Sequence, residues 1–133
     1  MTGTRTCVAV CGAVVLAIAG CGRDGPSRYE VSGTVTYDGQ SVPGGRILFA
    51  PDSARGNTGP GSVAEIRNGR YHTRREKGFT GGPCVVTIYG TDGSMPTEAR
   101  DNALFAPYET HVDLPQDDCR QDFDVPRQPT ARR

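Results

Sequence analysis

Short runs of alternating apolar and polar residues, separated by turn residues, set the strongest limit on what this chain can fold into. In YEVSGTVTYDGQ, Val31, Val35 and Tyr37 alternate with serine and threonine, which is the period-two pattern of a strand with one buried face. The pair Asp38-Gly39 then supplies a turn signal. Comparable runs are RILFAP (46–51), SVAEI (62–66), RYHT (70–73), CVVTIYG (84–90), ETHVDLP (109–115) and RQDFDVP (120–126). Seven short strands of this kind predict an all-β domain.

The turn residues support the same fold class. The chain contains 18 glycines and 10 prolines among 133 residues, and Asn68-Gly69 lies between two of the runs. An Asn-Gly pair in that position predicts a hairpin. The length supports one domain. We therefore expect two antiparallel sheets packed face to face over residues 29–126.

An apolar run near the N-terminus predicts export. Arg5 precedes an uninterrupted run of apolar or small residues from Cys7 to Gly20, the layout of a secretory signal. The run holds about 14 residues, whereas a membrane-spanning helix needs about 20. Its end, IAGC, resembles the bacterial lipobox, and the resemblance implies that Cys21 becomes the acylated first residue of the mature protein. An ordinary secretory signal and a retained membrane helix are the alternatives.

These features divide the chain into four predicted parts. They are a signal peptide (1–20), the lipidated Cys21 with a short tether (21–28), a β-sandwich (29–126) and a disordered tail (127–133). Fatty-acyl chains such as palmitate on Cys21 would hold the domain on a bacterial membrane, at its periplasmic or surface face.

The remaining cysteines predict a disulfide. Cys7 and Cys11 leave with the signal and Cys21 carries lipid, so only Cys84 and Cys119 stay in the exported domain. Two thiols in an oxidising compartment most often pair, and strand parity allows both to point inward. The bond would stabilise the fold by roughly 3 to 4 kcal/mol on the chain-entropy model. Two buried free thiols are the alternative, and a metal site lacks the usual ligand spacing.

A family resemblance accompanies the strand pattern. The segments VSGTVTYDGQSVPGGRILFAP, AEIRNGRY, GFTGGPCVVTIYG and FDVP resemble the carboxypeptidase regulatory-like, transthyretin-like domains found in small predicted lipoproteins of planctomycete-type bacteria. The resemblance covers most of residues 29–125 and implies a seven-stranded, immunoglobulin-like or transthyretin-like (prealbumin-like) sandwich. Asn68 and Cys84 depart from the family pattern. Its motifs mark turns and core positions, so they imply a fold rather than an activity.

Two histidines are the candidates for chemistry. His72 and His111 each lie within a predicted strand, where a half-exposed structural residue is expected. None of the GxSxG, HExxH, P-loop or EF-hand patterns occurs. Related hydrolases that open hydroxyisourate rings end in a YRGS-type tail, whereas this chain ends in PTARR. We therefore expect no enzyme. A small hydrolase near His72 or His111 is the alternative, favoured if a histidine meets a carboxylate in a pocket.

Weaker groups have simpler interpretations. The glycine-rich segments beginning at Gly56 and Gly78 are expected to be loops. An acidic group, expected to be solvated but also able to meet calcium, is Asp117, Asp118, Asp122 and Asp124. A basic group, expected to be solubilising with docking as the alternative, is Arg74, Arg75 and Lys77.

The charge balance narrows the function. Fifteen basic and fifteen acidic residues give a formal net charge of zero, without the basic excess of a nucleic-acid-binding protein. No cofactor or metal is predicted. The expectation is a membrane-anchored cell-envelope lipoprotein whose β-sandwich is a non-catalytic binding or structural module for an envelope protein or glycan.

Overall fold

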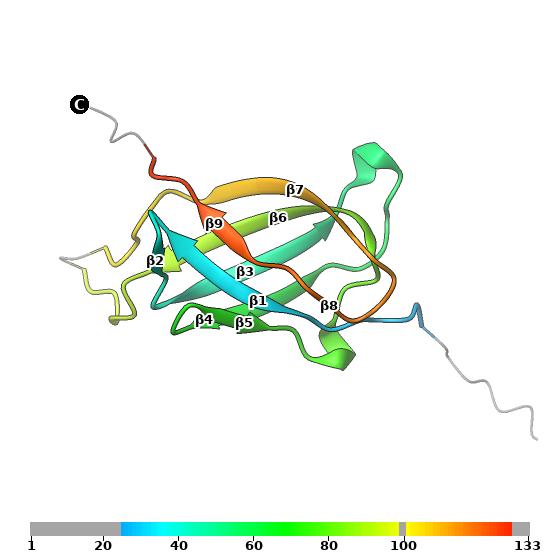
Figure 1. Cartoon of the computed structure of the whole chain (residues 1–133), viewed down its shortest axis with the longest axis horizontal. Coiled ribbons are helices and arrows are strands. Elements are labelled where there is room, and N and C mark those ends of the chain that lie inside the picture. Colours follow the sequence, from blue (N-terminus) through cyan, green and yellow to red (C-terminus); the bar gives the residue numbers. More distant parts are fainter. Residues whose placement is uncertain (1–24, 99–100, 129–133) are drawn as a thin grey trace, which may run out of the picture.

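The structure is a computed structural model that describes residues 25–98 and 101–128. Nine strands and two single-turn 3-10 helices make up its regular elements in that part of the chain (Figure 1). The strands are β1 (Val31–Tyr37), β2 (Gln40–Ser41), β3 (Gly44–Pro51), β4 (Ser62–Arg67), β5 (Arg70–His72), β6 (Gly82–Thr91), β7 (Tyr108–Leu114), β8 (Cys119–Arg120) and β9 (Phe123–Val125). The helices are η1 (Ser53–Arg55) and η2 (Arg75–Lys77). The predicted all-β class is confirmed.

Hydrogen bonds join the strands into one curled sheet rather than two separate sheets. Its order is β2-β1-β5-β4-β3-β6-β7, and these neighbours are all antiparallel. The two C-terminal strands, β8 and β9, instead run parallel to β1. The run RQDFDVP, expected to be one strand, is interrupted at Gln121 and Asp122, and Gln40–Ser41 forms an additional short strand, so the described strands number nine instead of seven.

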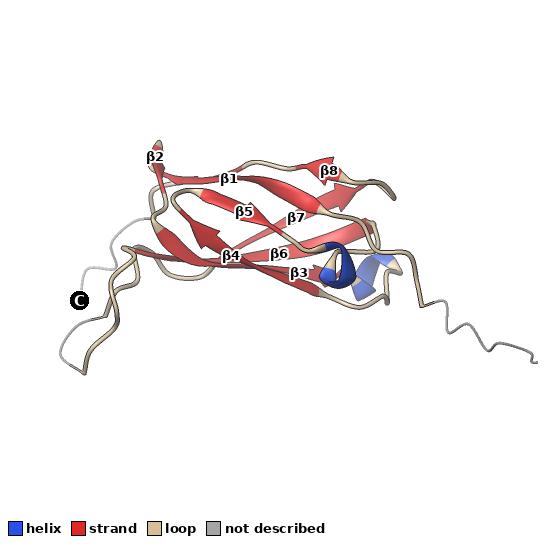
Figure 2. Ribbon diagram, turned by 90° about the horizontal axis from the view of Figure 1, so that it is seen from below, coloured by secondary structure: helices blue, strands red, loops and turns tan. Residues whose placement is uncertain are grey.

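The core lies between β1 on one side and β3 and β6 on the other, which Figure 2 shows from the edge. Alternation places every second side chain along most of β1, β4 and β6 in this core, as the sequence predicts. Phe49 sits at its centre, with the rings of Tyr71, Phe79 and Phe123 between 5.8 and 6.3 Å from its own. Apolar burial of this kind is the main stabilising contribution to such a fold.

Two tight turns carry the residues that their geometry requires. Asp38-Gly39 joins β1 to β2, and Asn68-Gly69 joins β4 to β5. All four residues have positive φ, between 50° and 78°, as a two-residue type I′ hairpin turn demands. Both sequence-predicted turns are therefore confirmed, and the second of them fixes the pairing of β4 with β5 on which the candidate site depends.

Gly33 allows the C-terminal strands to lie against β1. A Cβ atom at this position would lie 2.0 Å from the backbone oxygen of Gln121, the residue between β8 and β9. The hydroxyl of Tyr71 donates a hydrogen bond to the same oxygen. Burial raises the pKa of Tyr71 above its ordinary value, so the phenol stays protonated and keeps donating.

Candidate functional site

The β4–β5 hairpin directs basic side chains toward solvent because of its alternation. On β4, Ala64 and Ile66 face the core while Glu65 and Arg67 face outward. On β5, only Tyr71 faces the core. The basic face is defined by the arginine, lysine and histidine residues on the outer side of β4, β5 and β8 and of the segment after β5. They are Arg67, Arg70, His72, Arg74, Lys77 and Arg120.

Strand register fixes how these side chains are arranged. Arg67 is directly opposite Arg70 across the hairpin. On the other side of β5, Arg70 is opposite Thr34 and His72 is opposite Ser32. Ser32 in turn pairs with Arg120 on β8. Two hydroxyl-bearing residues of β1 therefore lie between the basic side chains of β5 and that of β8.

Two adjoining hollows lie on the basic face. The first has a volume of about 460 Å³ and is lined by Ser32, Gly33, Thr34, Arg67, Arg70, Tyr71, His72 and Arg120. The second has a volume of about 470 Å³ and is lined by Val63, Ala64, Glu65, Arg67, His72, Arg74 and Lys77. Arg67 and His72 line both, so the two hollows adjoin at these residues. Volumes of this size lie within the range of sites for small ligands.

Positive charge exceeds negative charge on the basic face. Arg67 pairs with Glu65 at 3.0 Å and Arg120 with Asp122 at 3.3 Å. Three further side chains make no hydrogen bond or ion pair with any described residue, and these are Arg70, Arg74 and Lys77. The direct opposition of Arg67 and Arg70 destabilises an isolated hairpin, because like charges face each other across the strand pair.

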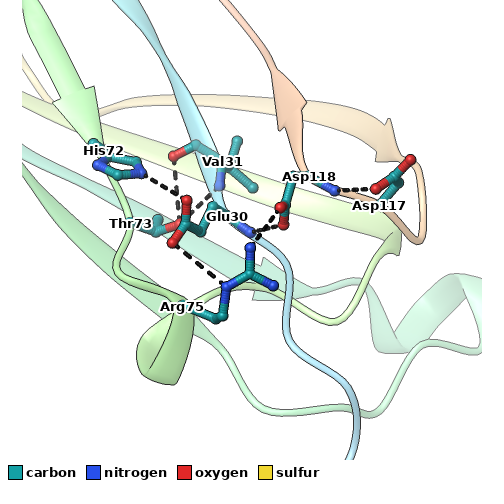
Figure 3. Close-up of polar contacts among 7 residues, drawn as sticks. All are labelled: Glu30, Val31, His72, Thr73, Arg75, Asp117 and Asp118. Atoms are coloured by element: carbon teal, nitrogen blue, oxygen red, sulfur yellow. Dashed lines mark hydrogen bonds and ion pairs between the residues drawn. The ribbon is translucent and has the colours of Figure 1, made fainter.

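An ion-pair network closes one end of the basic face, where the chain enters β1 (Figure 3). The Nε2 atom of His72 lies 3.3 Å from a carboxylate oxygen of Glu30. Arg75 lies between two carboxylates, 3.8 Å from Glu30 and 2.8 Å from Asp118. Buried Thr73 completes the junction, since its hydroxyl oxygen accepts the backbone N–H of Val31 at 2.8 Å. The network ties β1, β5, η2 and the turn before β8 together.

Asp118 holds this network through a backbone contact. Its carboxylate accepts the N–H of Glu30 at 2.8 Å, and this bond, with the nearby Arg75, lowers the pKa of Asp118 below its usual value. Asp122 behaves in the same way, since the Thr34 N–H, with Arg120 nearby, lowers its pKa. Both carboxylates therefore stay ionised near neutral pH and hold the C-terminal strands to β1.

His111 lies in a different part of the sheet, on β7, and also meets a carboxylate. Its Nδ1 atom is 3.3 Å from an oxygen of Asp52, whose side chain is only 7% exposed. Asp52 directly precedes η1, and Arg55 of that helix pairs with Asp113 of β7 at 3.1 Å. The pair thus lies where the segment leading into η1 contacts β7.

The two histidines differ from a catalytic arrangement in their other contacts. Each ring is a strand side chain more than half exposed, at 58% for His72 and 59% for His111, which confirms the sequence-based interpretation of their positions. Each also meets a carboxylate, and His72 lines both hollows, which is the contact that favours the hydrolase alternative. In the described part of the chain, neither ring hydrogen bonds to a serine, threonine or cysteine side chain that would act as a nucleophile.

The predicted disulfide between Cys84 and Cys119 is wrong, because both residues are free thiols. Cys84 is fully buried on β6 beside β3 and β7, with Asp52 nearby. Cys119 is half-buried on β8 beside β1, on the far side of β5, β4 and β3 from β6. Strand parity correctly turns Cys84 inward, but parity does not determine which strands are neighbours. Burial raises the pKa of Cys84 to about 12 and also raises that of Cys119.

The other sequence groups are separated by the fold. Asp117 accepts the N–H of Asp118, while Asp124 accepts the hydroxyl of Thr36. Residues 25–98 and 101–128 contain no group of three or more His, Cys, Asp or Glu residues placed to hold a metal ion. The basic triplet divides, with Arg75 in the ion-pair network and Arg74 and Lys77 on the basic face. Gly56 and Gly78 end η1 and η2, as expected for loop residues.

Several contributors to the site were missed at the level of sequence. Arg67, Arg70 and Arg120 were not singled out, although the alternation of RYHT already places Arg70 and His72 on one face. Asp52 gave no signal, since its burial depends on contacts distant in sequence. Cys21, the signal segment and the tail beyond Gln128 lie outside the described residues. Within the described ranges, no helix has the length and apolar character needed to cross a membrane.

Comparison of the chain with models of known protein families gives no match. Comparison with curated proteins likewise finds no relative.

Proposed function

We propose that this protein is a membrane-anchored cell-envelope lipoprotein whose β-domain is a non-catalytic binding module for an envelope glycan or protein. The observation that carries the proposal is the basic face, where cations without an acidic partner among the described residues line two adjoining hollows on a chain of zero net charge. The IAGC motif supports the anchor at Cys21. The resemblance to transthyretin-like sandwich domains supports a rigid β-domain that presents a binding surface.

The chemistry of the basic face favours an acidic ligand. Arginine presents a planar fork of donors that matches the oxygen pair of a carboxylate, sulfate or phosphate. Arg70 is held on a strand between two hydrogen-bonded neighbours, β1 and β4, so its backbone is fixed before a ligand arrives. Groups on rigid elements lose less conformational freedom when they bind.

The position of the tether fits a module held close to a surface. The described chain leads from Gly25 into Glu30, and Glu30 contacts His72 of the basic face. An anchor at Cys21 would therefore lie only a few residues from the end of the proposed binding surface. A tether of that length would keep the domain near the membrane.

Fractionation of cells tests the anchor. Wild-type protein should sediment with membranes, and Cys21→Ser should release it or leave it unprocessed, because the thiol that carries the lipid is absent. Cys119→Ser is the matched control and should sediment like wild type. An unchanged distribution of Cys21→Ser would show that the anchor assignment is wrong.

Co-sedimentation with isolated envelope fragments tests the binding surface. Full-length Arg70→Glu, in detergent, should lose most of its binding, while Arg127→Glu should keep it. Arg127 is a suitable control because it is 79% exposed, lies beyond β9 and has Asp38, at 3.9 Å, as its one ion-pair partner among the described residues. Equal binding by both variants would contradict a role for the basic face.

A small hydrolase is the second candidate, favoured by the contacts of His72 with Glu30 and of His111 with Asp52. A carboxylate that orients a histidine is one element of a general base. Purified protein should turn over an ester or amide if this candidate holds, and His72→Gln or His111→Gln should abolish turnover while the fold persists. No turnover of either substrate class favours the binding module.

A further inference from the structure

We infer that the basic face binds a linear acidic glycan, with carboxylate or sulfate groups held by Arg67, Arg70 and Arg120 in the first hollow and by Arg74 and Lys77 in the second. The inference rests on the proposed function and deepens it by naming the ligand class.

Among the residues of the basic face, Arg70 has the strongest requirement for an anion. Its side chain has no acidic partner among the described residues and lies opposite the cation of Arg67. Across β1 its cross-strand neighbour is the hydroxyl-bearing Thr34. An anionic group between the two arginines would offset their repulsion and accept hydrogen bonds from both. Ser32 and Thr34 add hydroxyls suited to a polar, hydroxyl-rich ligand.

The arrangement of the basic side chains in a row favours a linear ligand. The two hollows share Arg67 and His72, so one molecule can lie across both. Arg70, His72 and Arg74 occupy alternate positions, and the backbone at Arg74 is still extended, with φ −78° and ψ 149°. Alternate residues of an extended strand are roughly 6.6 Å apart on one face. This gives a row of cations and a histidine along β5, suited to a chain that bears repeated acidic groups.

Strand pairing beneath Arg70 favours a glycan over a protein segment. Peptides commonly bind a sheet by adding a strand, which requires an edge with unpaired backbone groups. Beneath Arg70 there is no such edge, since β5 pairs there with Thr34 of β1 on one side and with Arg67 of β4 on the other. A ligand held at Arg70 therefore lies on a paired part of the sheet.

The residues that line the two hollows disfavour a nucleic acid strand as the ligand. Single-stranded nucleic acids are held largely by stacking of bases on aromatic side chains. Among the described residues, Tyr71 is the one Phe, Tyr or Trp that lines either hollow, and it is 3% exposed and donates its hydroxyl to Gln121. The cations and hydroxyls of the face instead match the acidic and hydroxyl groups of a charged sugar chain.

Calorimetric titration of the full-length protein in detergent tests the inference with defined polymers. Polygalacturonate supplies carboxylates, dextran sulfate supplies sulfates, and neutral dextran supplies neither. We expect binding of at least one of the first two and none of dextran, with affinity that falls as salt is raised. Binding of polygalacturonate alone assigns carboxylates, and binding of dextran sulfate alone assigns sulfates. Failure of both acidic polymers would overturn the inference.

Variants separate a site from general charge attraction. Arg70→Gln should weaken binding of the preferred polymer at least about tenfold, as loss of a charge-assisted contact does, and Arg74→Gln should weaken it less. Arg127→Gln should leave it unchanged. Polyglutamate that binds as tightly as the glycan would overturn the choice of a sugar chain. Equal effects of Arg70→Gln and Arg127→Gln would overturn the site.

The two levels of proposal fail in different ways. If envelope binding depends on Arg70 but neither acidic glycan binds, the glycan inference is wrong and the binding module stands. If Arg70→Glu leaves envelope binding intact, the binding face itself is wrong. Thermal unfolding of each variant, followed by circular dichroism, checks that binding losses do not come from loss of the fold.

Discussion

The two histidine–carboxylate pairs have nearly the same geometry but different surroundings. His72 and His111 each lie 3.3 Å from a carboxylate, and their rings are 58% and 59% exposed. The partner of His72, Glu30, is 33% exposed and also pairs with Arg75. The partner of His111, Asp52, is 7% exposed, and within the described residues the histidine is its one ion-pair partner. Two similar strand histidines therefore have different energetic roles.

Burial of the carboxylate partner, rather than exposure of the histidine, decides how much such a contact contributes to the free energy of unfolding. A solvated carboxylate that loses one partner is rehydrated, whereas a buried one is left without compensation. Each free thiol belongs to one of the two regions. Cys84 lies near Asp52, and Cys119 directly follows Asp118. Both thiols and histidines can thus be used to test the comparison.

The largest expected effect is on thiol reactivity. In native full-length protein at neutral pH, iodoacetamide should modify Cys119 at least about 100-fold faster than Cys84, because buried Cys84 must await opening of the sheet. Its pKa of about 12 also leaves little reactive thiolate. Mass spectrometry of time points gives both rates, and in guanidinium the two should converge. Faster native labelling of Cys84 would break the comparison.

The next effect is on stability. His111→Ala should lower the free energy of unfolding by about 1–2 kcal/mol, since it leaves the buried Asp52 carboxylate unpaired. His72→Ala should lower it by less than about 0.5 kcal/mol, because Glu30 keeps Arg75 and is partly solvated. Urea unfolding measures both.

A double variant sharpens this result. Asp52→Asn should reduce the loss caused by His111→Ala, because the residue that remains carries no buried charge. The corresponding pair Glu30→Gln and His72→Ala should combine additively to within about 0.5 kcal/mol. Equal coupling in the two regions would show that burial of the carboxylate does not separate them.

The smallest effect concerns acid stability in the His72 region. The pKa of Asp118 is lowered in the folded state, so its contribution is present above the ordinary value of about 3.9 and lost as pH falls through the lower folded value. Asp118→Asn should therefore be less stable than wild type near pH 6, and the difference should shrink below about pH 4. Urea unfolding across pH measures this, with exposed Glu109→Gln as control. A difference that grows in acid would contradict the contact.

Local features of the fold were predictable from sequence, and distant pairings were not. The alternation around Val31 and the turn at Asn68-Gly69 depend on neighbouring residues, and both are confirmed. The parallel placement of β8 and β9 beside β1 was not predicted, because no local pattern specifies which strands pair. The same limitation explains the wrong pairing of Cys84 with Cys119, since inward parity gives a face but no neighbour.

The candidate site follows the same division. Alternation in RYHT places Arg70 beside His72, and the Asn-Gly turn sets Arg67 opposite Arg70, so half of the basic face is encoded locally. Arg120 joins it only through the distant pairing of β8 with β1. The burial of Asp52 depends on η1 and β7 together, which no short segment encodes.

The pairing of the first strand with the last ones has a consequence for how the chain is made. Thr36 on β1 and Asp124 on β9 are hydrogen bonded although they are 88 residues apart in sequence. During synthesis from the N-terminus, β1 appears first, but the strands that cover its outer edge appear last. Contacts so distant in sequence form slowly, and an uncovered edge invites pairing with other chains. A nascent chain that ends before Phe123 would therefore expose an unpaired edge of β1. We expect a chaperone to protect this edge from aggregation until β9 has been synthesised.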